Sequence, residues 1–107
     1  MSKSDFKLDF PRLLNESVSE ALSSLGESPK QTLLFHLEKN FSISQNAISD
    51  NVGAFDHALR SIFGASARLL ESIIIRRLDQ KAGISFEGFP NDDFTGTVAS
   101  LRHRLEG

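Results

Sequence analysis

Residues 69–83 have the sequence LLESIIIRRLDQKAG, in which three isoleucines follow one another between charged side chains. A run of β-branched residues is typical of a buried strand, but strands commonly span only about five or six residues. The flanking sequences LLES and RRLDQKAG show no alternation of apolar and polar residues. Gly83 is also a favourable residue for the end of a helix. The sequence therefore predicts a helix over residues 65–82.

The apolar side chains of this predicted helix extend around roughly two-thirds of its circumference when successive residues are placed about 100° apart. A helix that is apolar on most sides is buried on several sides. We therefore expect residues 65–82 to form the central buried helix of an all-α fold. The apolar residues expected to contact its neighbours are Ala67, Leu69, Leu70, Ile73, Ile74, Ile75, Leu78 and Ala82.

Two segments nearer the N-terminus have the apolar spacing of amphipathic helices. The first begins at Pro11, a residue that suits the first turn of a helix because the missing N–H would have no partner there. The second is SPKQTLLFHLEKN, in which Ser28 and Gln31 have the spacing of a capping box. In this helix Phe35 points away from the apolar face. Both segments are predicted to be surface helices with one buried face.

The remaining helices follow from the same kind of pattern. FSISQNAISDNVG is predicted to be a loop with one short helical turn after Ser44, and AFDHALRSIFG a helix that ends at Gly64. The connection from Gly64 to the helix at 65–82 is so short that the two must form a corner or hairpin. Asn91 or Asp92 is expected to cap a last helix. The apolar face of this helix is formed by Phe94, Val98, Leu101 and Leu105.

The length of 107 residues suits one domain. We therefore predict a compact all-α bundle of about five helices, with a flexible arm at residues 1–10 and a single helical domain at residues 11–107. No cysteine is present, which excludes disulfides and thiolate metal sites. No apolar run approaches the ~18–20 residues that span a bilayer, and the N-terminus lacks the apolar core of a signal peptide. We expect a cytoplasmic protein without a membrane partner.

No arrangement of residues typical of an active site is present in the sequence. The three histidines, His36, His57 and His103, share no metal-ligand spacing, and the glycines match no phosphate-binding loop. The carboxylates fall on the solvent faces of the predicted helices, so no buried acid with a raised pKa is expected. We therefore predict a protein that is not an enzyme, with no cofactor, no metal site and no evident small-molecule substrate.

His36 permits two interpretations. A histidine on a bundle helix with a lysine three positions later, here Lys39, is how histidine phosphotransfer domains present their phosphate acceptor. His36 also lies beside the apolar stripe of its predicted helix, where one hydrogen-bonded ring nitrogen would satisfy a partly exposed histidine. The second interpretation is the more common one for a histidine in such a position.

Three apolar residues lie outside the main apolar stripes of their predicted helices: Leu13, Phe35 and Ile75. They fill gaps in the core or form an exposed apolar patch, and such patches commonly mark protein partners. Self-association is a natural use of such a patch in a short chain, because a dimer buries area that a small core lacks. We take the three residues as the candidate partner surface.

The charge along the chain is uneven. Residues 60–86 contain five basic side chains and two acidic ones, whereas residues 1–59 contain five basic and eight acidic ones. A basic sector is compatible with phosphate contacts, and the corner before residue 65 has the outline of a helix-turn-helix. The alternative prediction is therefore a nucleic-acid-binding transcriptional regulator that uses residues 60–81. Its candidate anion contacts are Arg60, Arg68, Arg76, Arg77 and Lys81.

Two blocks of the sequence, ALSSLGESPKQTLLFHLEKNFSIS and FDHALRSIFGASARLLESIIIRRL, resemble the Nitrososphaera output domains, helical modules of archaeal signal-transduction proteins that also exist as short standalone chains. The resemblance implies an all-α fold and a non-catalytic role downstream of a sensor or receiver. It implies no catalytic residues. The leading prediction is therefore an output or interaction module of an archaeal signalling system that acts by contact with a protein partner or with itself.

Overall fold

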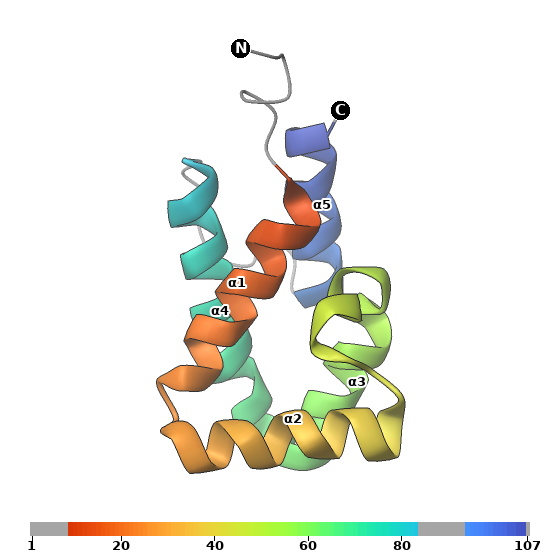
Figure 1. The fold of residues 1–107 in the computed structure, drawn as a ribbon. Helices are drawn as coiled ribbons and strands as arrows, with labels where there is room; N and C mark the ends of the chain where they lie inside the picture. Colours follow the sequence, from red (N-terminus) through yellow and green to blue (C-terminus); the bar gives the residue numbers. More distant parts are fainter. Residues whose placement is uncertain (1–8, 84–93, 107) are drawn as a thin grey trace.

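The structure of the chain, a computed structural model, describes residues 9–83 and 94–106. Within these residues the chain forms five α-helices and two short 3₁₀-helices, and no β-strand (Figure 1). The prediction of an all-α bundle is confirmed. In chain order the elements are α1 (Phe10–Ser23), α2 (Glu27–Phe41), η2 (Gln45–Asp50), α3 (Val52–Phe63), η3 (Gly64–Ser66), α4 (Ala67–Ala82) and α5 (Phe94–Glu106).

The first helix begins where the chain supplies an acceptor for the unpaired amide groups of a helix N-terminus. The carboxylate of Asp9 accepts a hydrogen bond from the N–H of Arg12 at 3.3 Å, and Pro11 lies in the first turn. Phe10, which we assigned to the flexible arm, is the first residue of α1 and is completely buried. The helical domain therefore begins before residue 11. Residues 1–8 lie outside the described part of the chain.

The start of α2 differs from the prediction. Gly26 takes the capping position with a φ of +106°, and the helix begins at Glu27. Ser28 consequently lies within the first turn, so its hydroxyl forms no cap, and the predicted capping box with Gln31 is wrong. The side chain of Gln31 instead donates to the carboxylate of Glu27 at 3.0 Å. A glycine at this position accommodates a left-handed backbone that other residues rarely adopt.

The connection between α3 and α4 is a tight corner. Gly64 has a φ of +62° and opens the 3₁₀-turn η3, after which α4 begins at Ala67. The predicted helix of residues 65–82 therefore starts two residues late, because its first residues form η3. Its end is as predicted, since Gly83 adopts the left-handed conformation of a C-terminal cap. The predicted short turn after Ser44 is η2.

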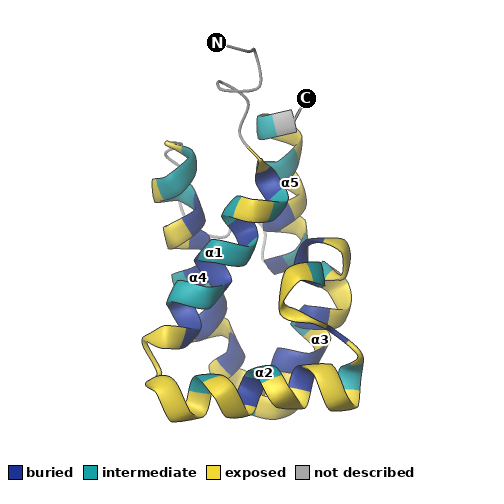
Figure 2. Cartoon of the chain, in the orientation of Figure 1, coloured by how far each residue is buried: buried dark blue, intermediate teal, exposed yellow. Residues whose placement is uncertain are grey.

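The helices are arranged with α1 and α4 side by side, while α2 crosses the lower end of the bundle (Figure 1). The α1–α2 turn and the α3–α4 corner lie at this same end. α4 contacts α1, α3 and α5, as expected of a central helix. α2 is the most exposed helix in this view, with only Leu33 and Leu37 fully buried in it (Figure 2).

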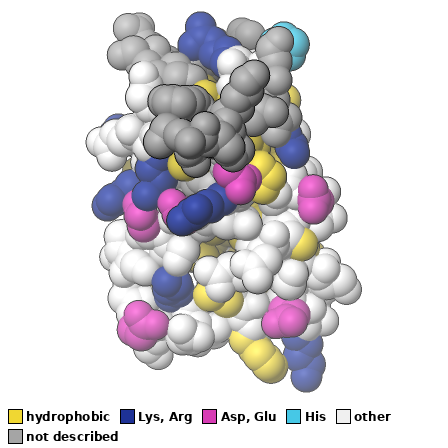
Figure 3. Space-filling model, turned by 45° about the horizontal axis from the view of Figure 1, so that its top comes forward, with side chains coloured by type: hydrophobic (Ala, Val, Ile, Leu, Met, Phe, Trp, Pro, Cys, Tyr) yellow, Lys and Arg dark blue, Asp and Glu magenta, His cyan; other side chains and the backbone are white. Residues whose placement is uncertain are grey.

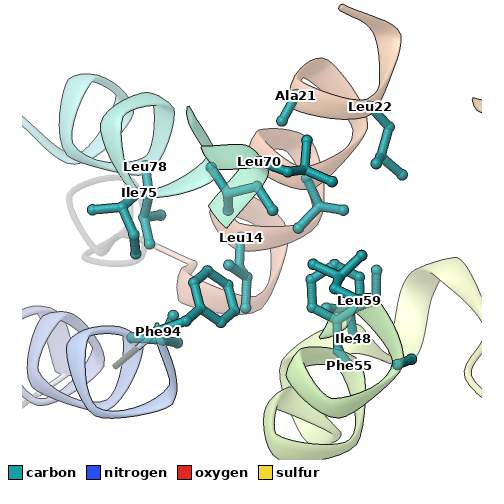
Figure 4. Packing of buried hydrophobic residues seen from close by; sticks show 14 of the residues in the cluster. Leu14, Ala21, Leu22, Ile48, Phe55, Leu59, Leu70, Ile75, Leu78 and Phe94 are labelled. Atoms are coloured by element: carbon teal, nitrogen blue, oxygen red, sulfur yellow. The ribbon is translucent and has the colours of Figure 1, made fainter. Parts of the chain in front are cut away.

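The core is formed by side chains from all five α-helices and from η2. In Figure 4 the labelled residues of α1, α3, α4 and α5 point toward one another, and Phe94 faces the same interior as Leu14. The rings of Phe55 and Phe94 lie 6.1 Å apart between centroids. Burying a residue of this size contributes roughly 2–3 kcal/mol, so these contacts between segments distant in sequence fix the tertiary fold.

The surroundings of α4 are more open on one side than the sequence indicates. Its stripe at Leu70, Ile74 and Leu78 is buried as predicted, but Leu69 is 69% exposed. The predicted contact of Leu69 with the core is wrong because the residue points away from α1, α3 and α5 on the outer sector that Arg76 shares. α4 thus has one solvent-facing side.

Among the described helices, none combines the length and the apolar composition that crossing a membrane requires.

α5 begins at Phe94, and its predicted apolar face is present, with Phe94, Val98 and Leu101 buried. The predicted cap at Asn91 or Asp92 lies outside the described residues.

Candidate interaction site

An open groove lies between α2 and the last turn of α3. Its volume is about 650 Å³, and most of its wall is apolar. The apolar groove, as we name it, is lined by Leu25, Pro29, Leu33, Ile62 and Phe63, together with the polar residues Ser28, Thr32 and His36. Among the residues that the structure describes, no acidic residue and no lysine or arginine lines it. Its wall therefore suits an apolar surface better than a charged ligand.

The large exposed apolar side chains of the described residues belong to the end of the molecule that bears this groove. Leu25 in the α1–α2 turn is 39% exposed and Ile62 at the end of α3 is 36% exposed, and both line the apolar groove. Phe35 of α2 is 64% exposed, with the Lys39 ammonium 5.6 Å from its ring centroid. Leu69 lies in the first turn of α4, next to the α3–α4 corner. Exposed apolar residues concentrated in one region are typical of an interaction surface.

The three residues predicted as a partner surface are not brought together. Phe35 is exposed, as its position on α2 indicates. Ile75 is only 3% exposed, and Leu13 is half-buried against the core. The prediction of an exposed surface is therefore wrong for Ile75, because α5 covers the side of α4 that the sequence left unassigned. Leu25, Ile62 and Leu69 are the exposed residues that sequence reasoning missed.

His36 lies on the exposed side of α2 and lines the apolar groove. Its Nδ1 lies 2.7 Å from Nδ2 of Asn40, and its ring stands edge-on to Phe41 with centroids 5.9 Å apart. These contacts are those expected of a flanking histidine with one satisfied ring nitrogen. Phosphorylation of His36, the less common of the two interpretations, stays untested.

Acidic residues of α1 face basic residues of α4 along their antiparallel contact. The ammonium of Lys81 lies 2.7 Å from Oε2 of Glu20 and 3.7 Å from Oε1 of Glu16, and Nη1 of Arg77 lies 3.5 Å from Oε1 of Glu20. The hydrogen bond to Glu20 raises the pKa of Lys81 above its ordinary value. We call these four residues the α1–α4 seam. Two acids face two bases in it, and Glu16 also pairs with Arg12 of its own helix, whose Nε lies 3.1 Å from Oε2.

The residues predicted as anion contacts therefore differ in their partners and in their exposure. Arg77 and Lys81 belong to the α1–α4 seam, and Arg60 Nε donates to Oδ1 of Asp56 at 3.2 Å. Arg76 is exposed on the outer side of α4. Figure 3 shows Lys and Arg side chains next to Asp and Glu side chains on the visible face, rather than a broad basic area. The described residues thus do not form a continuous basic sector.

A second cluster lies where α3 meets α4. It consists of Asp56 and Arg60 on α3 and Arg68 and Glu71 on α4, and we call it the corner cluster. Glu71 is only 2% exposed, and its Oε2 has no hydrogen-bond partner among the described atoms. A hollow of about 450 Å³ opens beside it. This corner hollow is lined by Arg60, Gly64, Ala65, Ala67, Arg68 and Glu71.

The two carboxyl groups of the corner cluster affect each other strongly. Burial of Glu71, its hydrogen bond to Asp56 and the negative charge of Asp56 raise the pKa of Glu71 from 4.5 to about 8. Arg60 and Arg68 favour the ionised form and oppose this rise. At neutral pH Glu71 is therefore mainly protonated, whereas Asp56 forms the ion pair with Arg60.

The expectation that no acid is buried is wrong for Glu71. The sequence contained a signal that we missed: Glu71 is four residues after Ala67 and four before Ile75, which are both buried. Residues at this spacing share a helix face, so Glu71 belongs to the apolar stripe of α4 itself. A carboxylate within an apolar stripe is the pattern that predicts a buried acid.

Comparison with known proteins supports the fold and leaves the function open. No protein-family model matches the chain, and no curated protein is significantly similar to it. Among solved structures, the crystal structure of PH0832 from Pyrococcus horikoshii OT3 is similar, with a TM-score of 0.73 and 24% sequence identity. The match covers 92% of this chain and 100% of that one. At this identity the likeness shows a shared fold in an archaeal protein that carries no functional name.

Proposed function

We propose that this protein is a non-catalytic interaction module of an archaeal signalling or regulatory system and that it binds an apolar face of a partner protein in the apolar groove. The observation on which the proposal depends is the groove itself, with Leu25 and Ile62 exposed in its wall. The resemblance to helical output domains suggests the signalling context, and binding by a groove between helices requires no catalytic residue.

The groove is suited to a helix more than to a small molecule. Small-molecule sites usually place several polar groups so that they converge on one ligand. The polar side chains here, Ser28, Thr32 and His36, follow one another along α2 at spacings of four residues and so lie in a row. An amphipathic helix that places its apolar side chains between α2 and α3 matches such an elongated surface.

The nucleic-acid alternative has less support from the described residues. Arg60, Arg77 and Lys81 each form an ion pair with a carboxylate of this chain. Phosphate binding by these side chains requires the carboxylates to be displaced, which lowers the gain from each contact. Ile74 and Ile75, in the middle of the second helix of the apparent helix-turn-helix, are buried and face away from any groove of DNA.

A photo-crosslinking experiment tests this proposal. Ile62 is replaced by p-benzoylphenylalanine in the full chain, which is then irradiated in lysate of the source organism. The matched control carries the same group at Gln80, which is exposed on α4 and outside the groove. We expect a defined adduct from position 62 and none from position 80. Excess unlabelled wild-type chain should compete for the adduct, whereas excess Leu25→Asp chain should not.

Three results would contradict the proposal. Equal adducts from positions 62 and 80 would show non-specific contact, and the absence of any adduct would show that nothing occupies the groove. An adduct with twice the mass of the chain would identify the occupant as a second copy instead of a different protein.

A further inference from the structure

We propose that α2 is a hinged strap beside the apolar groove, that it swings away from α1 and α3 as one unit, and that a partner helix enters the groove while α2 is displaced. The inference rests on the proposed function, because it concerns how the partner reaches the same groove. It makes binding depend on how firmly α2 is attached to the rest of the fold.

α2 is attached to the core by few buried side chains. Of its 15 residues only Leu33 and Leu37 are buried, and Leu34 and Phe41 are partly so, whereas six of the 14 residues of α1 are buried. Most of the surface of α2 faces solvent where the helix crosses the end of the bundle (Figure 2). Burial of an apolar face supplies most of the stability of a helix in a protein. A helix with few buried contacts therefore opens at a lower free energy than the rest of the fold.

The polar attachment of α2 to α1 depends on Lys30. Its ammonium donates hydrogen bonds to the hydroxyl groups of Ser19 at 3.0 Å and Ser23 at 2.9 Å, and we call this contact the Lys30 latch. At the other end of α2, the ring of Phe41 stands edge-on to His57 of α3, with 6.5 Å between the centroids. Among the described residues no ion pair joins α2 to another helix, whereas three ion pairs form the α1–α4 seam. The latch is thus a weak attachment that one substitution can remove.

Both ends of α2 have a residue that suits a hinge. Gly26 directly precedes the helix with a φ of +106°, and Ser42 directly follows it with a φ of +57°. The left-handed conformation is unfavourable for a residue with a Cβ, so movement of the chain at Ser42 releases strain. Hinges are typically a few residues at the ends of elements that absorb a change in φ and ψ. Gly26 and Ser42 therefore allow α2 to move without disruption of the helix itself.

The groove is too small to hold a helix while α2 is in place. Its volume is about 650 Å³. Three turns of a helix with side chains, about 10–12 Å wide and about 16 Å long, occupy roughly 1,500 Å³. Leu33 lines the groove but is only 5% exposed. A partner can thus insert only one row of side chains, whereas displacement of α2 widens the groove and exposes Leu33 and Leu37 to the partner.

The Lys30 latch and the groove lie on opposite sides of α2. Lys30 is two residues from Thr32 of the groove wall, which places the two side chains about 160° apart around the helix. A substitution of Lys30 therefore leaves the wall of the groove intact. An effect of such a substitution on binding must act through the position of α2.

Two matched variants test this dependence. The probe is a fluorescent designed peptide that forms an amphipathic helix with one leucine face, and its binding to the full chain is measured by anisotropy. Lys30→Met removes the latch, and we expect about fivefold tighter binding, the factor that corresponds to the net contribution of one hydrogen bond, because the open form becomes more populated. Lys39→Met removes the same charge from the same helix, where Lys39 lies over the ring of Phe35 of α2, and should leave the affinity unchanged.

A covalent lock tests the opposite direction. The chain has no cysteine, so the double substitution Ser23→Cys and Lys30→Cys provides the two thiols of the protein for a short bismaleimide. The crosslink fixes the half of α2 that lines the groove to α1. We expect the crosslinked chain to bind the peptide about tenfold more weakly than the same chain before crosslinking, because the open form is no longer accessible.

Hydrogen exchange measures the opening in the absence of any ligand. The amides of α2 should exchange through a local opening that depends little on low concentrations of urea, whereas those of α4 should exchange only with global unfolding. Lys30→Met should accelerate exchange in α2 about fivefold and leave exchange in α4 unchanged.

The outcomes distinguish this inference from the proposed function. If α2 and α4 exchange at the same rate and with the same dependence on urea, α2 does not open as a unit and the inference is wrong. If the crosslinked chain binds as well as the uncrosslinked one, or if Lys30→Met binds more weakly than wild type, the groove binds a partner without displacement of α2 and the inference is also wrong. If no chain binds the peptide, the proposed function and the inference are both contradicted.

Discussion

The α1–α4 seam and the corner cluster contain the same kinds of residue, two carboxyl side chains and two basic ones, but they differ in burial. In the seam, Glu16 and Glu20 have side chains that are 43% and 41% exposed, and both face Lys81. In the corner cluster, Glu71 is 2% exposed and lies against a second acid, Asp56. Water solvates both carboxylates of the seam, whereas burial makes a second negative charge in the corner costly.

The difference shows that composition alone does not give the charge of a surface. Counting residues assigns both clusters a net charge of zero. In the seam each acid faces a basic side chain, whereas in the corner cluster burial and the neighbouring Asp56 favour the protonated form of Glu71.

Replacing a glutamate by lysine in each cluster is expected to give the largest contrast. Glu71→Lys buries a third positive charge beside Arg60 and Arg68 and should destabilise the fold by about 3–5 kcal/mol. Glu20→Lys changes an exposed pair in the seam and should cost about 1 kcal/mol or less. Urea unfolding followed by circular dichroism measures both. Similar losses for the two variants would contradict the difference in burial.

The pH dependence of stability should show the corner acid directly. The pKa of Glu71 is about 8 in the folded state and 4.5 as the ordinary value, so the folded state binds the proton more tightly. The contribution of protonated Glu71 to the free energy of unfolding is complete below about pH 4.5 and is lost as the pH rises toward 8. Relative to the Glu71→Gln variant, the wild-type chain should therefore lose about 2–3 kcal/mol between pH 5 and pH 7.

Unfolding in urea at a series of pH values tests this difference. Glu71→Gln keeps the size and the hydrogen-bonding capacity of the side chain but has no acidic proton to lose. It is therefore the matched reference for the wild-type chain. Parallel pH profiles for the two chains would show that Glu71 ionises in the folded state as it does in water.

The smallest effect is expected in the seam. Replacing Glu16 and Glu20 together by glutamine removes the partners of Lys81 and Arg77 and should cost about 1 kcal/mol or less, because exposed ion pairs contribute little. About 1 M salt screens charges beyond roughly 3 Å, so the difference from wild type should shrink there. Thermal unfolding at low and high salt measures it. A loss as large as that of Glu71→Lys would mean that the seam is essential to the fold.

The helices of this chain could be predicted because each has an apolar period and most are followed by a glycine, although α2 ends at a left-handed Ser42 instead. The isoleucines of α4 illustrate this, since the buried stripe continues through Leu70, Ile74 and Leu78 and ends at Gly83. The boundaries that depend on backbone conformation could not be predicted. The start of α2 was displaced by the left-handed Gly26, and the start of α4 by η3.

The candidate site was predicted only in part, since it depends on how the helices face one another. The exposure of Phe35 followed from its helix position, but Ile75 was placed on the surface because the sequence does not show that α5 covers it. The pairing of Asp56 with Glu71 joins two helices across a corner. The acidic residue in the stripe of α4 was visible in the sequence, whereas its partner on α3 required the tertiary structure.

The protonation of Glu71 is the central claim, and a ¹³C NMR titration of its side-chain carboxyl carbon in the folded full-length chain measures it most directly. A midpoint near pH 8, accompanied by a response in the Asp56 carboxyl signal, is the expected result. A midpoint near 4.5 would contradict it, since Glu71 would then ionise in the folded chain as it does in water.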